Sequence, residues 1–220
     1  MSKTHLYFVP GMAANSQIYE HIELDSTLFE THFLEWKIPI SQEETMPEYA
    51  QRMCDEITHE NPVLIGVSFG GLMVQEMSKI IPTKKVIIIS SIKSNQELSK
   101  RFKVVAATKV YKLFPAKFLE NIDSYIDYFL GDYQKHKIEA YKKFLSVRNA
   151  DYLHWAIFNA LHWQQTEEIK DIIHIHGTKD GVFPIKHIHN CIEVKNGTHA
   201  MILIKAKKIS SIIRDTLTCK

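Results

Sequence analysis

The stretch Pro62-Val63-Leu64-Ile65-Gly66-Val67-Ser68-Phe69-Gly70 joins a short apolar run to a segment with helical spacing that begins near Leu72. The apolar run is typical of a buried strand, so the pattern predicts a strand, a sharp turn and a helix. Such a turn raises the Ser68 hydroxyl above the edge of the sheet, and only residues as small as Gly66 and Gly70 let strand and helix pass so closely. The alternative is an ordinary glycine-rich turn with an inert serine.

Strands and helices alternate on both sides of this turn. Short apolar runs that end in Gly, Pro or Ser predict strands over residues 6–9, 33–38, 63–67 and 86–89. Apolar residues at helical spacing predict helices over residues 46–59 and 72–81. This alternation implies an α/β fold with a mostly parallel sheet, because right-handed crossovers through helices connect parallel strands.

A long helical stretch then interrupts the strand pattern. Residues 93–165 are charged and rich in aromatic side chains, with helical periodicity broken at Pro115 and Gly131. Strands are predicted again over 172–175 and 191–194, and an amphipathic helix over 200–217. We therefore expect a core domain formed by residues 1–92 and 166–220, with residues 93–165 inserted as a helical cap.

The charge balance does not identify a partner. The chain has 27 Lys and Arg residues against 25 Asp and Glu residues, a formal charge of +2, which does not indicate nucleic-acid binding. Residues 93–151 carry twelve basic and seven acidic residues. A solvated helix surface explains that excess best, and attraction of an anionic substrate or acidic carrier is the alternative.

The cysteines and the first residues of the chain bear on location. The 3 cysteines are widely spaced and odd in number, which suggests neither a disulfide framework nor a zinc motif. The first apolar run is too short for a signal peptide or a membrane span. We expect a cytoplasmic protein without membrane insertion, cofactor or metal.

The strand–turn–helix around Ser68 resembles the nucleophile turn of the α/β-hydrolase superfamily. A second landmark is Tyr7-Phe8-Val9-Pro10-Gly11-Met12, at the position of the family's oxyanion loop, although Pro10 stands where histidine is usual. The resemblance implies a doubly wound sheet of about six strands, without the N-terminal strand pair that often precedes it, and a helical cap over the site. It also implies an oxyanion hole formed by the backbone amides of Met12 and Phe69.

A geometric filter selects the acid and the base, because catalytic groups in an open parallel sheet lie beyond the carboxyl ends of strands. His199 follows the predicted strand 191–194, and Asp180 follows the strand 172–175, so the chain order Ser68, Asp180, His199 is the one typical of this fold. The filter removes the other nearby histidines. Their His-x-His spacing suggests metal binding only weakly, since no third ligand is evident; they are His174, His176, His187 and His189.

These residues predict a serine hydrolase of a small carboxylester or thioester, with His199 as base and Asp180 as orienting acid. There are three alternatives. The first is acyl transfer to another acceptor, including peroxide, and the second is hydrolysis of a carbon–carbon bond. The third is a non-catalytic protein that binds a small ligand or a partner. Trp155 and Trp163 lie in an aromatic segment where the chain returns to the sheet. They are predicted either to pack the cap or to line the acyl pocket.

Overall fold

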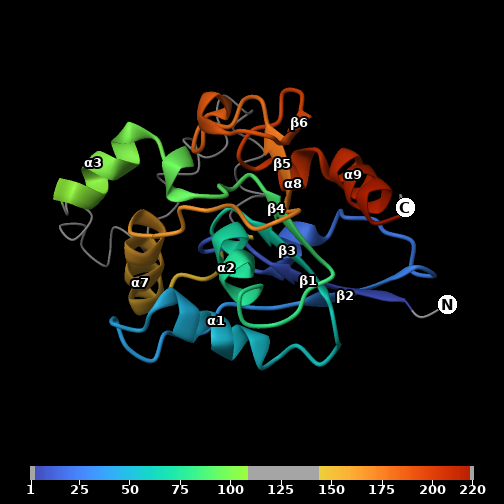
Figure 1. Cartoon of the computed structure of the whole chain (residues 1–220), viewed down its shortest axis with the longest axis horizontal. Helices are drawn as coiled ribbons and strands as arrows, with labels where there is room; N and C mark the ends of the chain where they lie inside the picture. The colour runs from blue at the N-terminus through green and yellow to red at the C-terminus, as the bar shows by residue number, and fades with distance from the viewer. Residues whose placement is uncertain (1–2, 109–143, 219–220) are drawn as a thin grey trace.

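The computed structural model describes residues 3–108 and 144–218 (Figure 1). In this part of the chain one six-stranded sheet has the order β2-β1-β3-β4-β5-β6, and every neighbouring pair is parallel. Strand β2 lies beside β1 toward one edge of the sheet, whereas β3 lies on the opposite side of β1. The strand order therefore reverses between β1 and β3. The predicted doubly wound α/β class is confirmed. The strands are β1 (Thr4–Val9), β2 (Phe29–Phe33), β3 (Val63–Val67), β4 (Lys85–Ile89), β5 (Ile173–Gly177) and β6 (Ile192–Val194).

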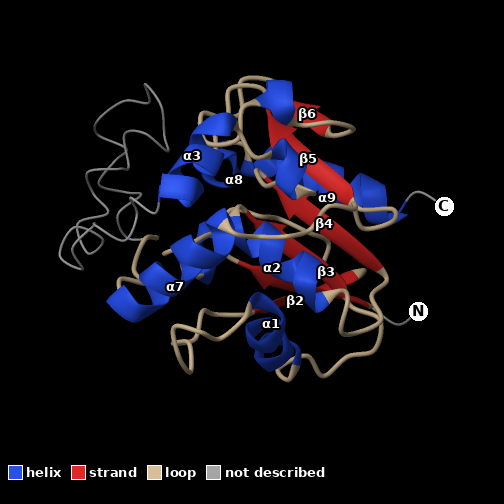
Figure 2. Ribbon diagram, turned by 60° about the vertical axis from the view of Figure 1, so that its left-hand side comes forward, coloured by secondary structure: helices blue, strands red, loops and turns tan. Residues whose placement is uncertain are grey.

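Helices cover both faces of the sheet because alternate side chains of the strands point to opposite sides. Tyr7 and Val9 of β1 belong to the core beneath one group of helices, whereas Leu6 and Phe8 belong to the core beneath the other. Figure 2 shows α1, α2 and α7 close together beside the sheet. The first group is α1 (Met46–Cys54), α2 (Phe69–Met77) and α7 (Ala150–Leu161); the second is the 3-10 helix Ser16–Tyr19, α8 (Met201–Ile204) and α9 (Ala206–Thr218).

Local capping determines where two helices of the first group begin. The Thr45 hydroxyl accepts a hydrogen bond from the amide of Glu48, and the Glu48 side chain returns a bond to the Thr45 amide, which is a capping box. The Asn149 side chain accepts a hydrogen bond from the Tyr152 amide and caps α7. The helix predicted over 46–59 ends earlier, at Cys54.

The second strand differs from its prediction. The sequence predicts a strand over 33–38, but β2 occupies Phe29–Phe33. Ile38 is 61% exposed, so this apolar stretch does not form a buried strand. The true strand reads as mostly polar because it lies at the edge of the sheet, where only Phe29 is buried. The final helix also differs, since it is divided at Lys205 into α8 and α9.

The predicted cap falls partly outside the described residues, because 109–143, with Pro115 and Gly131, are not among them. Helix α3 (Lys100–Thr108) is held near the carboxyl end of β5 by Arg101, which donates to the carbonyls of Gly181 and Val182. Helix α7 instead packs into the core against α2. The cap boundary at 93–165 stays a prediction. Within the described ranges, no helix combines the length and apolar character needed to cross a membrane.

Candidate active site

Ser68 occupies a strained turn between β3 and α2. Its backbone has φ 53° and ψ −118°, a conformation that non-glycine residues rarely adopt. A β-carbon on Gly66 would collide with the backbone of Gly70, as the sequence pattern predicts. The Ser68 amide donates to the Ile89 carbonyl at 2.9 Å, and the Ser91 hydroxyl donates to the Ser68 carbonyl at 2.8 Å. Neighbouring β4 therefore holds the turn in place from one side.

His199 reaches Ser68 from the loop between β6 and α8. Its Nε2 lies 2.9 Å from Ser68 Oγ, and the residue is 8% exposed. The loop is placed by the close approach of Gly177 and Gly197, since a β-carbon on Gly177 would meet the Gly197 backbone. Two residues 131 positions apart in sequence are thereby brought within hydrogen-bond distance.

Asp180 completes the group on the far side of the imidazole. Its Oδ2 lies 2.9 Å from His199 Nδ1, and its Oδ1 accepts hydrogen bonds of 2.8 Å from the amides of Val182 and Phe183. A carboxylate only accepts, so His199 Nδ1 carries the proton and Nε2 presents its lone pair to the Ser68 hydroxyl. Burial raises the pKa of Asp180, but the charge and hydrogen bond of His199, the charge of His176 and the Phe183 amide together leave that pKa below its ordinary value.

Two further histidines, His174 and His176, lie near Asp180 on the side away from His199, although their position in the sequence did not predict a place in the site. His176 is fully buried, with Nε2 2.8 Å from the Phe183 carbonyl oxygen and 3.6 Å from Asp180 Oδ2. Its Nε2 must donate to that carbonyl, so its Nδ1 accepts the 3.1 Å hydrogen bond from His174 Nε2. The filter by strand ends missed His176 because the loop after β5 folds back one turn. The four-residue separation of His176 from Asp180 is the signal that could have identified it.

The two amides predicted to bind an oxyanion lie beside Ser68. Val9 and Gly66 are register partners, so the loop after β1 begins level with the end of β3. A β-carbon on Gly11 would lie 3.7 Å from the Ser68 β-carbon, which brings the Met12 segment next to the serine. Phe69 is the first residue of α2, where amides have no partner within the helix. Within residues 3–108 and 144–218, neither the Met12 nor the Phe69 amide donates to a protein acceptor.

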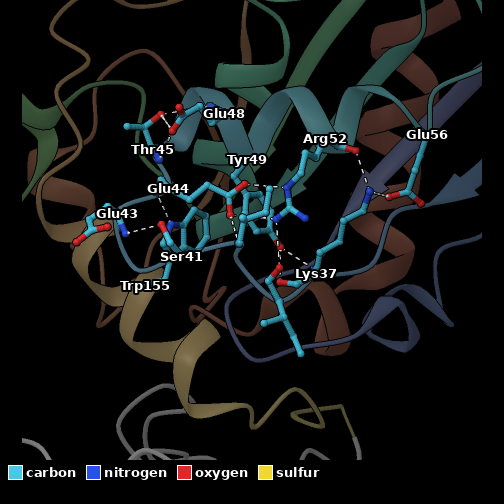
Figure 3. A network of polar contacts seen from close by, with 12 residues as sticks. Lys37, Ser41, Glu43, Glu44, Thr45, Glu48, Tyr49, Arg52, Glu56 and Trp155 are labelled. Atoms are coloured by element: carbon cyan, nitrogen blue, oxygen red, sulfur yellow. Dashed lines mark hydrogen bonds and ion pairs between the residues drawn. The ribbon is translucent and has the colours of Figure 1, made fainter.

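The two tryptophans considered as pocket residues are buried against helices α1 and α2. Trp155 is 0% exposed and donates from Nε1 to the Glu44 carbonyl at 2.6 Å, within the polar network of Figure 3. Its ring stacks on Tyr49 with centroids 4.2 Å apart. Trp163 is 5% exposed and donates to Glu76 Oε1 at 2.7 Å. These contacts support the packing role, and a substrate contact by either ring stays a prediction.

Other aromatic rings approach the site more closely, and the sequence analysis did not select them. Phe183 meets His199 edge to face, with centroids 5.5 Å apart. Trp36 donates from Nε1 to the Gly11 carbonyl at 2.9 Å and lies 5.2 Å from the Phe69 ring. Apolar surface therefore flanks both the base and the oxyanion loop.

Comparison with known proteins agrees with this topology. No family model and no curated protein matches the sequence. Among solved structures, a bromoperoxidase from Bacillus anthracis has a TM-score of 0.73 at 15% identity, with 99% of this chain and 93% of that chain covered. A hydrolase from Pseudomonas aeruginosa PA01 has a TM-score of 0.73 at 11% identity, covering 99% and 91%. This is the α/β-hydrolase fold. A thermophilic esterase from Thermogutta terrifontis shares it, with a TM-score of 0.66, 13% identity and coverage of 98% and 90%.

Within the α/β-hydrolase fold the place of a site follows from topology. Ligands bind outside the carboxyl ends of the strands, where the strand order reverses. In this chain the order reverses between β1 and β3. The segments that follow these two strands carry Met12 and Ser68, so the polar groups described above meet at the switch point.

Proposed function

We propose that the protein is a serine hydrolase that cleaves a small carboxylester or thioester through an acyl-enzyme on Ser68. The observation that carries the proposal is a continuous hydrogen-bonded chain. Ser68 Oγ lies 2.9 Å from His199 Nε2, while His199 Nδ1 lies 2.9 Å from Asp180 Oδ2. In this arrangement the imidazole accepts the serine proton, and the carboxylate holds its tautomer and stabilises the imidazolium that forms.

The proposed reaction has two halves. Ser68 Oγ attacks the acyl carbon as His199 takes its proton, and the same proton then passes to the leaving alcohol or thiol. Water, deprotonated by His199, attacks the acyl-enzyme and releases the acid. In both halves the amides of Met12 and Phe69 are the donors for the oxyanion, and one such donor contributes about 2.7–4 kcal/mol in the transition state.

The nucleophile and its surroundings support an acyl substrate. Serine forms an acyl ester that water hydrolyses, whereas branches of this fold that open epoxides use an aspartate at the turn. Phe183 beside His199 and Trp36 beside the oxyanion loop offer apolar contacts to a small acyl group. The name of the Bacillus anthracis neighbour suggests peroxide as a second acyl acceptor, so the acceptor is part of the test.

We also propose a cytoplasmic location and a small-molecule partner. Cys54 and Cys191 are free thiols, and Cys54 is buried. Burial raises the pKa of the Cys54 thiol to about 11, which fits an unreactive cysteine in a reducing compartment. The overall charge of +2 gives no support to a nucleic-acid partner. An acidic carrier is supported only by the excess of basic residues in 93–151.

Turnover of a series of p-nitrophenyl esters and acyl thioesters tests the function. We expect Ser68→Ala to abolish hydrolysis, and Asp180→Asn to lower kcat by about 10⁴-fold because the imidazole loses its correct tautomer. Ser26→Ala changes an exposed serine and is the matched control. Addition of hydrogen peroxide separates the acceptors, because peracid forms only if peroxide replaces water. Hydrolysis by Ser68→Ala at the wild-type rate would contradict the mechanism.

A further inference from the structure

Three histidines from separate segments meet on one face of the sheet, away from Ser68. His5 lies in β1, His32 in β2, and His59 in the connection between α1 and β3. One ring nitrogen from each lies within 4.8 Å of the other two. In the described ranges 3–108 and 144–218, no other set of three or more histidine, cysteine or carboxylate side chains converges in this way. Their spacing in the sequence matches no metal motif, so only the fold brings them together.

The strand register explains why the group forms. His5 is paired with Glu30, and Tyr7 is paired with His32, so the four side chains share the face of β1 and β2 that α1 covers. His59 arrives from the turn that follows α1, and its ring stacks on His5 with centroids 3.5 Å apart. Two strands and one connection of the chain therefore converge beside the edge strand β2.

One distance within the group suits a small divalent ion. His5 Nδ1 and His32 Nε2 lie 3.1 Å apart, and two nitrogens bound tetrahedrally at about 2.0–2.1 Å from zinc lie about 3.3 Å apart. Glu30 Oε2 lies 3.9 Å from His5 Nδ1, and Glu30 Oε1 lies 3.9 Å from His32 Nε2. The Glu30 side chain is 48% exposed and lies outside the group of three, so it must turn inward to become a ligand. Coordination requires the parallel rings of His5 and His59 to tilt so that their nitrogens face one point. The side chains of His5 and His32 are 25% and 24% exposed, so an ion can reach them from solvent.

A hydrogen bond from outside the group holds one of its imidazoles in orientation. The Tyr7 hydroxyl lies 2.7 Å from His59 Nδ1 and fixes that ring, as outer hydrogen-bond partners do for metal-binding histidines.

We propose that His5, His32 and His59, with the Glu30 carboxylate as fourth ligand, bind one divalent transition-metal ion of the Zn²⁺ type. Three imidazoles and one carboxylate are a ligand set that zinc accepts in tetrahedral geometry. The ion ties edge strand β2 and the turn before β3 to β1, so its role is structural. The site lies on the flank of the sheet and is separate from the hydrolytic group at the carboxyl ends of the strands.

Metal titration of untagged protein, stripped with a chelator and then dialysed, tests the proposal. Co²⁺ is added first, because tetrahedral Co²⁺ absorbs visible light, and Zn²⁺ then displaces it. We expect one equivalent to bind, with a visible band, and a higher melting temperature with Zn²⁺. His32→Gln and His59→Gln should each weaken Zn²⁺ binding by more than about 100-fold, whereas Tyr7→Phe, which removes only the outer partner, should weaken it by about 10-fold.

His21→Gln is the matched control, because His21 lies outside the group and its side chain is 62% exposed. It should bind Zn²⁺ as the wild type does. Circular dichroism establishes that each variant is folded. Should a histidine variant fail to fold, Tyr7→Phe still tests the site, because it keeps the ring that stacks on His32 with centroids 4.5 Å apart. Absence of a visible Co²⁺ band in the wild type would overturn the proposal, as would equal Zn²⁺ affinity in wild type, His32→Gln and His59→Gln. The three rings would then be an aromatic stack and no more.

Discussion

The Nε2 atom of His176 lies 3.6 Å from Oδ2 of Asp180, the same oxygen that faces His199. The Asp180 carboxylate thus has an imidazole on each side, and both are buried with it. The Phe183 carbonyl requires His176 Nε2 to donate, so this N–H also points its positive end toward the carboxylate region. His176 is therefore placed to hold Asp180 in its ionised form without touching the reacting atoms.

His176→Phe should reduce kcat/KM by about 10-fold, the equivalent of about 1.4 kcal/mol. Removing the N–H takes away an interaction that lowers the pKa of Asp180, so that pKa rises. At the acid end of the pH–activity profile, where the Asp180 carboxylate itself is protonated, the acid limb should then begin at higher pH, which a loss of packing alone would not cause. His189→Gln, an exposed histidine on the following loop, is the control. An acid limb that stays in place would contradict the positioning role.

The buried histidines make stability depend on pH. Burial, followed by the charges of His176 and Lys93, holds the pKa of His174 well below 6.5, and burial lowers that of His176. Below pH 6.5 the unfolded chain binds protons at these histidines that the folded chain does not. Stability is therefore complete above pH 6.5 and falls as pH decreases toward the folded-state pKa values.

Urea unfolding between neutral and mildly acidic pH checks this prediction. In that window, each histidine makes the free energy of unfolding change with pH by up to about 1.4 kcal/mol per pH unit. His174→Phe removes one of these groups and should flatten the dependence, whatever its effect on stability at neutral pH. A slope equal to that of the wild type would show that His174 does not stay neutral in the fold.

Gly70 and Gly11 give a matched pair for the turn at Ser68. A β-carbon on Gly70 would collide with the backbone of Val9 and Pro10, whereas one on Gly11 would meet ordinary contacts at 3.7 Å. We expect Gly70→Ala to lower the free energy of unfolding by about 1–3 kcal/mol, and Gly11→Ala to change it by less than about 0.5 kcal/mol. Chemical denaturation of both variants measures the difference. Equal stabilities would mean that the close approach of α2 to β1 is not needed.

The sequence predicted the parts of this molecule whose signals are local. The glycines around Ser68 and the apolar run before it indicated the turn, and five of the six strands lie where apolar runs predicted them. Strand β2 was displaced because an edge strand buries little and its sequence carries a weak apolar pattern. The order of Ser68, Asp180 and His199 in the chain, together with their positions after predicted strands, was enough to predict that they lie together.

Features that depend on packing between distant segments could not be predicted from the sequence. His176 was set aside as a strand residue because a strand position says nothing of how the following loop folds back. The meeting of His5, His32 and His59 depends on the register of β1 with β2 and on the turn after α1. For Trp155 the sequence allowed both packing and a place in the acyl pocket, and only the structure gives its N–H a partner in Glu44.

The proposed hydrolysis requires that His199 activate Ser68 as a nucleophile. Intact-mass analysis after treatment with a fluorophosphonate, on the wild type and on Ser68→Ala, detects this activation as a covalent adduct. We expect a single adduct on the folded wild type and none on Ser68→Ala. A folded wild type that forms no adduct, or a Ser68→Ala variant that is labelled equally, would contradict an activated Ser68 and favour a non-catalytic binding protein on the same fold.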